Sequence, residues 1–416
     1  MSIMTSEPSS IPATRTGGFD AERALAAIER VLDDEPRPVA LHEPQFAGNE
    51  WEYVKETLDT GWVSSAGKYV ERFERQLADY CQVPHAVAVV NGTAALQVCL
   101  MLAGVHRDDE VLVPALTFIA TANAVSYCGA VPHFCDCSSA TLGIDPHALE
   151  QYLSAIAEVS QGQCRNRKSG RRIAAVVPMH TFGHPTDMDA LAEVAARWRL
   201  ALVEDVAEAL GSRYKGRHVG YHGVTTALSF NGNKIATTGG GGAILTCDAA
   251  IARAAKHITT TAKLPHRWAF LHDQVGFNYR LPNINAALGC AQLEQVPGAV
   301  AAKRRLAVRY AEEFRRVPGA SIFTDADFAE SNYWLVTMLL DRPDEAERDR
   351  FLAACHERGI LCRPIWTGLH RLPMYCSCPR MELKQAERLE FQVVNLPSSA
   401  RLGMALKQHD PCRTAK

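Results

Sequence analysis

From about Ala86 onward, short apolar runs rich in β-branched residues alternate with segments whose apolar residues recur at helical spacing. Such alternation predicts an α/β domain with a mostly parallel sheet. Six runs are predicted strands, and they lie at 86–90, 110–114, 174–178, 200–204, 226–230 and 242–246. Ligands of such sheets bind at the carboxyl ends of the strands. The residues that directly follow each run are therefore the first candidates for chemistry.

The same pattern divides the chain into three parts. Residues 1–18 are polar and carry no visible chemistry, and the apolar spacing of 25–32 predicts a helix after them. Beyond Pro297 we expect a helix, a strand, a helix and a strand, at 297–316, 333–340, 345–358 and 360–363. The predicted parts are an N-terminal tail with its helix, a large ligand-binding domain and a small C-terminal α+β domain, at 1–36, 37–296 and 297–416.

Composition narrows the class of protein. The 416 residues are 47% hydrophobic and carry a formal net charge of -2, which argues against a protein that coats nucleic acid or an anionic membrane. The N-terminus lacks the apolar core of a signal peptide, so we expect a cytoplasmic protein whose 13 cysteines are mostly small buried residues. Cys376 and Cys378 lack a second pair, so no metal site is predicted. The polar, basic stretch 161–172 is expected to be a surface loop.

Lys234 is the first candidate for chemistry. It follows a predicted strand and precedes four glycines at 239–242, so a nucleophilic amine there would be well placed. A solvated lysine is the alternative. Asp205 directly follows another apolar strand, where a buried carboxylate needs a cation such as a protonated pyridine nitrogen. A helix N-cap is the alternative for Asp205.

Two other strand ends carry weaker signals. In VVNGTAALQVCL, the amides of Thr93 and Ala94 are predicted at a helix N-terminus, which is suited to binding phosphate. Many strand-to-helix turns contain the same residue types. Phe118 follows the strand at 110–114, where its ring can stack on a planar ligand or pack in the core.

These residues belong to segments that occur in a fixed order, namely NGTAAL, LTFIATANA, VPMHTFGHPTDMDAL, VEDVAEALGS, SFNGNKIATTGGGG and GFNYRLPNINAALGCAQLE. In that order the chain resembles the DegT/StrS sugar aminotransferases from Leu41 to about Ala400. Four further segments resemble the LegC-type branch of that family, namely LHEPQFAGNE, DTGWVSSAGKYVERFE, LCRPIWTGLHRLPMY and VVNLPSSA. The resemblance implies pyridoxal 5'-phosphate as cofactor and an aspartate-aminotransferase-like fold (fold type I) with a mixed, mostly parallel seven-stranded sheet. It also implies a homodimer whose active sites lie between the subunits.

The resemblance assigns roles to residues around the cofactor. Lys234 would hold it as a Schiff base, Asp205 would bind the pyridine nitrogen and Phe118 would pack against the ring. Thr93, Ala94 and Ser229 would bind the phosphate, together with Asn278 from the partner subunit. Glu208 stands where many relatives have Gln or His near the phenolic oxygen, and Phe182 stands where the family often has Tyr, so no hydroxyl role is assigned there.

Five residues are candidates for substrate contacts. His180 and His184 lie just past a predicted strand and either border the site or are structural histidines. Lys263, His266 and Arg267 either neutralise a nucleotide diphosphate or belong to a solvated loop.

The resemblance implies a reaction in two halves. L-Glutamate would give its nitrogen to the cofactor, leaving pyridoxamine 5'-phosphate and 2-oxoglutarate. The nitrogen would then pass to C4 of a UDP- or GDP-linked 2-acetamido-2,6-dideoxy-4-keto-hexose, for a diamino sugar or a legionaminic-type nonulosonic acid of surface glycans. Lys234 would move the proton.

Three other interpretations remain open. Sugar deoxygenation with pyridoxamine phosphate occurs in relatives with histidine at the lysine position, so Lys234 argues against it. A non-catalytic regulator that keeps the cofactor is the second. Transamination at C3 of a sugar, or of another ketone, is the third.

Overall fold

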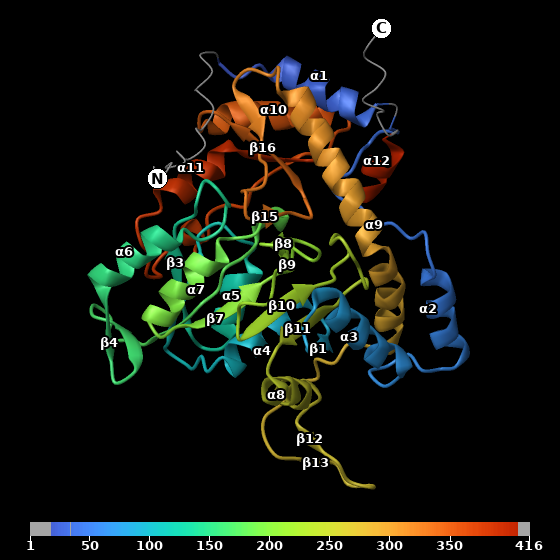
Figure 1. The fold of residues 1–416 in the computed structure, drawn as a ribbon, viewed down its shortest axis with the longest axis vertical. Coiled ribbons are helices and arrows are strands. Elements are labelled where there is room, and N and C mark those ends of the chain that lie inside the picture. The colour runs from blue at the N-terminus through green and yellow to red at the C-terminus, as the bar shows by residue number, and fades with distance from the viewer. Residues whose placement is uncertain (1–17, 34, 407–416) are drawn as a thin grey trace, which may run out of the picture.

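The computed structural model describes residues 18–33 and 35–406, so most of the predicted tail and residues 407–416 lie outside the described residues. A seven-stranded sheet forms the centre, with the strand order β1-β11-β10-β7-β6-β2-β3 (Figure 1). Its strands are β1 His85–Val89, β2 Glu110–Pro114, β3 Val131–Cys135, β6 Ile173–Val176, β7 Ala201–Asp205, β10 Thr225–Ser229 and β11 Gly242–Thr246. Strand β11 is antiparallel to both neighbours and the other pairs are parallel. The predicted fold class is confirmed.

The helices of the first two thirds of the chain are α1 Ala21–Leu32, α2 Glu50–Asp59, α3 Lys68–Cys81, α4 Gly92–Leu102, α5 Ala120–Tyr127, α6 Pro146–Ile156, α7 Met188–Arg197 and α8 Ala249–Thr259, with a short 3-10 turn at Thr181–Gly183. Several begin at an aspartate whose carboxylate accepts a hydrogen bond from an amide of the first turn, as Asp145, Asp187 and Asp248 do. Such caps fix the point at which each helix starts. Strand-to-helix turns are thereby held at defined positions along the edge of the sheet.

The C-terminal part begins with the long helix α9 Asn283–Phe314, which runs from the large sheet to the small domain in Figure 1. Its further elements are β14 Ala320–Ile322, β16 Val336–Leu340, α10 Glu345–Glu357, β17 Arg363–Pro364, a 3-10 turn at Leu369–Arg371, α11 Lys384–Gln392, β18 Val393–Leu396 and α12 Ala400–Ala405. The four strands form one antiparallel sheet in the order β14-β16-β18-β17. The apolar face of α1 packs into the core of this small sheet rather than against the large one. The boundary between the predicted domains at 296/297 remains a prediction.

Three predicted elements differ from the observed ones, and one observed strand was missed. The strand expected at 360–363 is observed as β17 at Arg363–Pro364, while Ile360 forms only an isolated bridge with Val39. The helix expected from Pro297 begins 14 positions earlier, at Asn283, because a helix can continue through a proline at the cost of one hydrogen bond and some bending. The strand expected from Tyr333 begins at Val336, since Tyr333 has a left-handed backbone with φ of 47°. Strand β3 was not predicted, because Pro132 and the buried His133 interrupt its apolar pattern.

The stretch 161–172 is also corrected. Instead of an irregular loop, residues 161–166 form the turn and the second strand of a hairpin made of β4 Ala157–Ser160 and β5 Gln163–Asn166. Gln161 and Gly162 have φ of 50° and 75°, as a two-residue hairpin turn requires. Alternate burial of Cys164 and Asn166 fixes the face of β5 that points inward.

The remaining strands are short pieces, namely β8 Arg213–Tyr214, β9 Arg217–His218, β12 Lys263–Leu264, β13 Leu271–His272 and β15 Ala329–Glu330. Strands β12 and β13 form a hairpin that extends away from the body of the protein below α8 (Figure 1). Among the described residues, none of the helices has the length and apolar character that crossing a bilayer requires.

Candidate active site

Lys234 lies in the loop between β10 and the glycine run that leads into β11. Its Nζ is 3.2 Å from Oε1 of Glu208 and 3.9 Å from the ring centroid of Trp334. The side chain is only 12% exposed. The amine is therefore held between a carboxylate and an aromatic face, and the alternative of a solvated lysine is excluded.

Asp205 ends β7, the strand that pairs with β10. Its buried carboxylate accepts hydrogen bonds from Oγ1 of Thr121 at 2.9 Å and from the amide of Ala207 at 3.1 Å. Burial raises the pKa of Asp205 above its usual value. The next regular element is β8, so Asp205 is not a helix N-cap. A carboxylate buried at this strand end suits a cationic partner, as the sequence predicted.

Glu208 lies in the turn after β7 and is buried. Its two carboxylate oxygens accept hydrogen bonds from different groups, Oε2 from the amide of Phe182 at 3.0 Å and Oε1 from Lys234. Burial raises the pKa of Glu208 to about 7, although Lys234 acts to lower it. The proton of this carboxyl group is thus exchangeable near neutral pH, a few ångströms from the amine.

The start of α4 lies beside the end of β10, at the position where the sequence predicts phosphate binding. A Cβ added at Gly92 would lie 2.8 Å from Cβ of Ser229, so the glycine allows the end of β10 to approach the first turn of the helix. Thr93 lies in that first turn, whose amides have no acceptor within the helix. The amide of Ala94 differs from the expectation, because it already donates to Oδ1 of Asn91 at 2.8 Å. The Thr93 amide and the Ser229 hydroxyl are therefore the stronger candidates for phosphate binding.

Phe118 lies between β2 and α5 and is 51% exposed. The interpretation as a core phenylalanine is wrong, because buried aromatic residues of this protein are almost fully covered. An aromatic side chain with this exposure could contact a planar ligand. Thr121, three residues further on, hydrogen-bonds to Asp205, which ties the Phe118 segment to the end of β7.

The two candidate histidines are buried and make polar contacts within the protein. His180 accepts a hydrogen bond at Nδ1 from the amide of Thr186 and faces Glu204 through Nε2 at 3.3 Å, so both ring nitrogens are used inside the core. His184 pairs with Asp325 at 3.1 Å, in the segment before β15. Both rings are almost fully buried. Nε2 of His184 is buried and has no hydrogen-bond partner among the described residues, so a contact of either histidine with the substrate stays a prediction.

Lys263, His266 and Arg267 are not brought together with Lys234. They lie on the β12–β13 hairpin, which extends away from the body of the protein (Figure 1). Lys263 and Arg267 lie over the rings of Phe270 and Trp268, with centroid distances of 4.2 and 5.3 Å. Within a single chain the hairpin is an exposed arm, so a role in substrate binding stays a prediction.

Two residues of the small domain were missed by the sequence analysis. Trp334 donates from Nε1 to the carbonyl of Asn233 at 2.8 Å, which fixes its ring beside Lys234. Asn332 donates to the carbonyls of Glu208 and Leu210 and accepts from the amide of Trp334. No local pattern marks them, because they reach the site only through tertiary contacts between segments about 100 positions apart.

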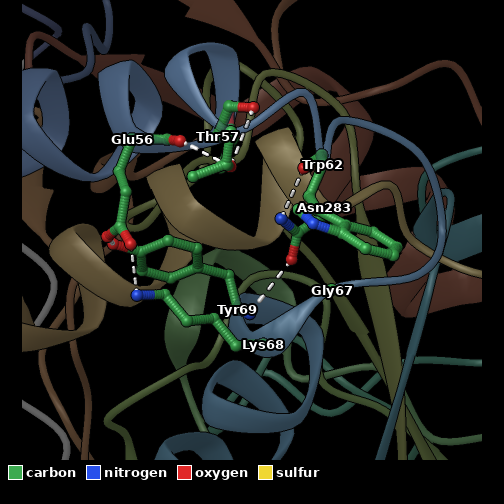
Figure 2. Close-up of a pocket in the computed structure, with 8 residues that line it drawn as sticks. Glu56, Thr57, Trp62, Gly67, Lys68, Tyr69 and Asn283 are labelled. Carbon is green, nitrogen blue, oxygen red and sulfur yellow. Dashed lines mark hydrogen bonds and ion pairs between the residues drawn. The ribbon is translucent and has the colours of Figure 1, made fainter.

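A separate cavity of about 400 Å³ lies between α2, the start of α3 and the start of α9. Figure 2 shows that its polar lining groups point toward one another, with Lys68 paired to Glu56 and Asn283 bonded to the amide of Tyr69 and the carbonyl of Trp62. None of the residues predicted for the site lines it. The group around Lys234 therefore stays the candidate active site.

The model of the DegT/DnrJ/EryC1/StrS aminotransferase family matches residues 44–409. The chain belongs to this family. The aminotransferase is 37% identical over 372 residues to the GDP-perosamine synthase of Caulobacter vibrioides, covering 89% of this chain and 95% of that protein. It is 36% identical to the GDP-perosamine synthase of Escherichia coli O157:H7, covering 86% and 93%. The crystal structure of DesI in the presence of its TDP-sugar product has 30% identity and a TM-score of 0.74, covering 88% of each chain.

The aminotransferase uses pyridoxal phosphate, as its family does, and the observed residues fit that group. Asp205 offers a buried carboxylate to a pyridinium nitrogen, and Phe118 is an exposed aromatic residue that could pack against the ring. Gly92 and Ser229 form a cradle at a helix N-terminus that favours a phosphate. Lys234 would supply the amine that binds the cofactor.

Proposed function

We propose that this aminotransferase transfers an amino group from L-glutamate to C4 of a nucleotide-linked 2-acetamido-2,6-dideoxy-4-keto-hexose. The observation that carries the proposal is the placement of Lys234 between Glu208 and Trp334, beside the strand that ends at Asp205. That arrangement provides a positioned amine, an exchangeable carboxyl proton and an anionic partner for a cationic ring in one site.

The bound cofactor supplies an electron sink that makes the hydrogen next to the transferred nitrogen acidic. Asp205 keeps the sink effective, because its anion favours the protonated pyridine nitrogen. Lys234 Nζ would act as base and then as acid, moving this proton between the carbon that bears the amine and C4' of the cofactor. Glu208 accepts a hydrogen bond from the amine in the structure described here, which orients Nζ while it carries a proton.

The substrate class rests on two kinds of support. Relatives more than 30% identical bear the name GDP-perosamine synthase, and DesI was solved with a TDP-sugar product, so nucleotide-linked sugars recur among them. The choice of C4 and of a 2-acetamido-6-deoxy sugar rests on the LegC-type segments, such as LHEPQFAGNE and VVNLPSSA. We propose that UDP or GDP carries the sugar and that the product serves the synthesis of a diamino sugar or a legionaminic-type acid for surface glycans.

We also propose a homodimer with shared active sites. Asn278 is exposed in the single chain, as a residue that completes a partner's phosphate site would be before assembly. The β12–β13 arm exposes Trp268 and Phe270, at 73% and 78%, which is unusual for aromatic residues of a monomer. Contacts of Lys263, His266 and Arg267 with a nucleotide diphosphate would then be made across the interface.

The test is a visible spectrum of the purified protein loaded with pyridoxal phosphate. L-Glutamate should bleach the band of the lysine-bound cofactor, and a UDP- or GDP-linked 4-keto-6-deoxy sugar should restore it. Use of 15N-labelled glutamate, followed by mass spectrometry and NMR of the sugar, gives the position of the new amine. A band that glutamate never bleaches contradicts the proposed donor and supports a non-catalytic regulator. Bleaching that no 4-keto sugar reverses contradicts the proposed acceptor.

A further inference from the structure

The chain around His42 is anchored beside the small four-stranded sheet. The amide of Ser398 donates to the carbonyl of Leu41 at 2.7 Å, and the amide of Glu43 donates to Oγ of Ser399 at 2.9 Å. Both serines directly follow β18, a strand of that sheet. The backbone on each side of His42 is thus fixed, and the direction in which its side chain leaves the chain is fixed with it.

The imidazole of His42 lies beside the loop that carries Lys234. Its ring centroid is 6.3 Å from that of Trp334, whose ring also faces Nζ of Lys234. His42 and Ile235, the residue after Lys234, line the same small cavity of about 30 Å³. Both ring nitrogens of His42 are covered, and neither makes a hydrogen bond among the described residues. A covered N–H group without an acceptor costs free energy, so this ring needs a partner.

The carbonyl oxygen of Asn233 is the acceptor within reach of that ring. It acts to raise the pKa of His42, as a carbonyl close to a ring nitrogen does, although the two groups are not aligned as a hydrogen bond. The same oxygen accepts Nε1–H of Trp334 at 2.8 Å. A carbonyl oxygen has two lone pairs, so it can accept a second donor. This oxygen belongs to the planar peptide group that joins Asn233 to Lys234, and holding it orients the start of Lys234.

The charge state of His42 suits such a contact. Burial lowers the pKa of His42 well below its usual value, and the amines of Lys303 on α9 and of Lys234 act in the same direction. The ring is therefore neutral at neutral pH, with one N–H donor and one acceptor nitrogen. A neutral donor holds the loop without placing another positive charge beside the amine.

We propose that His42 is a positioning residue for Lys234, whose ring N–H turns to the carbonyl of Asn233 and, together with Trp334, holds the peptide group from which Lys234 begins. The inference rests on the proposed function, in which the amine of Lys234 must reach a carbon atom to move a proton. Proton transfer slows steeply when the group that carries the proton is displaced. The sequence analysis assigned no role to His42, although it lies in the segment LHEPQFAGNE.

Three variants test the proposal. His42→Phe keeps a ring but removes the donor, whereas His42→Asn and His42→Gln place an amide N–H near the position of Nδ1 and of Nε2, respectively. One readout is the rate at which the apoenzyme forms the visible band with pyridoxal phosphate. The other is the maximal rate of bleaching by L-glutamate, together with the glutamate concentration that gives half of that rate.

His42→Phe should lower both rates about 5-fold to 10-fold, as expected for the loss of one hydrogen bond. The half-saturating glutamate concentration should change less than about twofold, because His42 is not expected to contact the donor. One of the two amide variants, the one whose N–H reaches the Asn233 carbonyl, should recover most of both rates. A purely structural role would lower the melting temperature of the variants but would not distinguish the two amides in these rates.

The control is His147, an exposed histidine of α6, replaced by Phe and by Gln, and both rates should stay at the wild-type value. Wild-type rates in His42→Phe would overturn the proposal, and so would two amide variants that are both as slow as His42→Phe. If His42→Phe does not fold, judged by circular dichroism and melting temperature, the amide variants decide, and equal rates in the two would overturn the proposal. A wild-type band that glutamate never bleaches contradicts the proposed function, while the rate of band formation still tests His42.

Discussion

Replacement of Glu208 by glutamine should change how the stability of the apoenzyme depends on pH. Burial raises the pKa of Glu208 from 4.5 to about 7. Because the folded pKa lies above the unfolded one, the folded state prefers the protonated carboxyl group, and stability is lost as pH rises from below 4.5 through about 7. Each whole step of pKa corresponds to about 1.4 kcal/mol, so the loss amounts to about 3 kcal/mol between pH 4 and pH 8.

Glutamine cannot ionise, but its amide oxygen can still accept the hydrogen bond from Phe182. The variant should therefore lack this part of the pH dependence without losing the backbone contact. The assay is urea unfolding of both apoenzymes at several pH values, taken as the difference between wild type and Glu208→Gln at each pH so that other titrating groups cancel. Wild type should lose about 3 kcal/mol relative to the variant by pH 8. A difference that stays constant from pH 4 to pH 8 would refute the reasoning.

Three further substitutions test the surroundings of the site. Trp334→Leu removes the ring beneath the Lys234 amine, an interaction worth about 1 kcal/mol, and should lower kcat about fivefold. Trp334→Phe keeps an aromatic ring and should retain most of the wild-type kcat in the same kinetic assay. Equal losses of kcat in the two variants would show that the ring face is not what matters. Gly92→Ala places a methyl group 2.8 Å from Cβ of Ser229 and should weaken binding of pyridoxal phosphate about 10-fold. Ser229→Ala should have a similar effect, and titration of the apoenzyme measures both. An unaltered affinity would show that this part of the protein does not bind the phosphate. Asp205→Asn should lower kcat at least 10-fold with an unchanged circular dichroism spectrum, and a wild-type rate would exclude Asp205 from the reaction.

The sequence predicts the large sheet well because its strands are apolar runs with clear ends, and six of its seven strands follow such runs. Strand β3 was not predicted because Pro132 and His133 interrupt its apolar pattern. The structure accommodates His133 in the strand because its ring hydrogen-bonds to buried Glu110 on the neighbouring strand β2. The hairpin after Ala157 escapes because polar residues dominate it, although the pair Gln161 and Gly162 is a turn signal.

The site could be predicted only as far as each residue marks its own strand end. Asp205 ends β7, and Lys234 lies in the loop that follows β10, the strand that pairs with β7. Trp334 lies 100 positions from Lys234 and reaches it through packing of the small domain, which no periodic pattern records. The Ala94 amide shows a different limit of the sequence. The start of the helix was predicted, but the side chain of Asn91 caps it and accepts the hydrogen bond of the Ala94 amide. Residues that act through tertiary contacts need the fold before their role becomes visible.

The central claim is that Lys234 is the lysine that binds the cofactor, and peptide mapping tests it most directly. The protein is loaded with pyridoxal phosphate, reduced with borohydride to fix the linkage, digested and analysed by mass spectrometry, with Lys234→Ala treated in parallel. The account predicts the cofactor on the peptide that contains Lys234, and neither a modified peptide nor a visible band in the variant. A cofactor fixed to another lysine, or a variant that still forms the band, would contradict it.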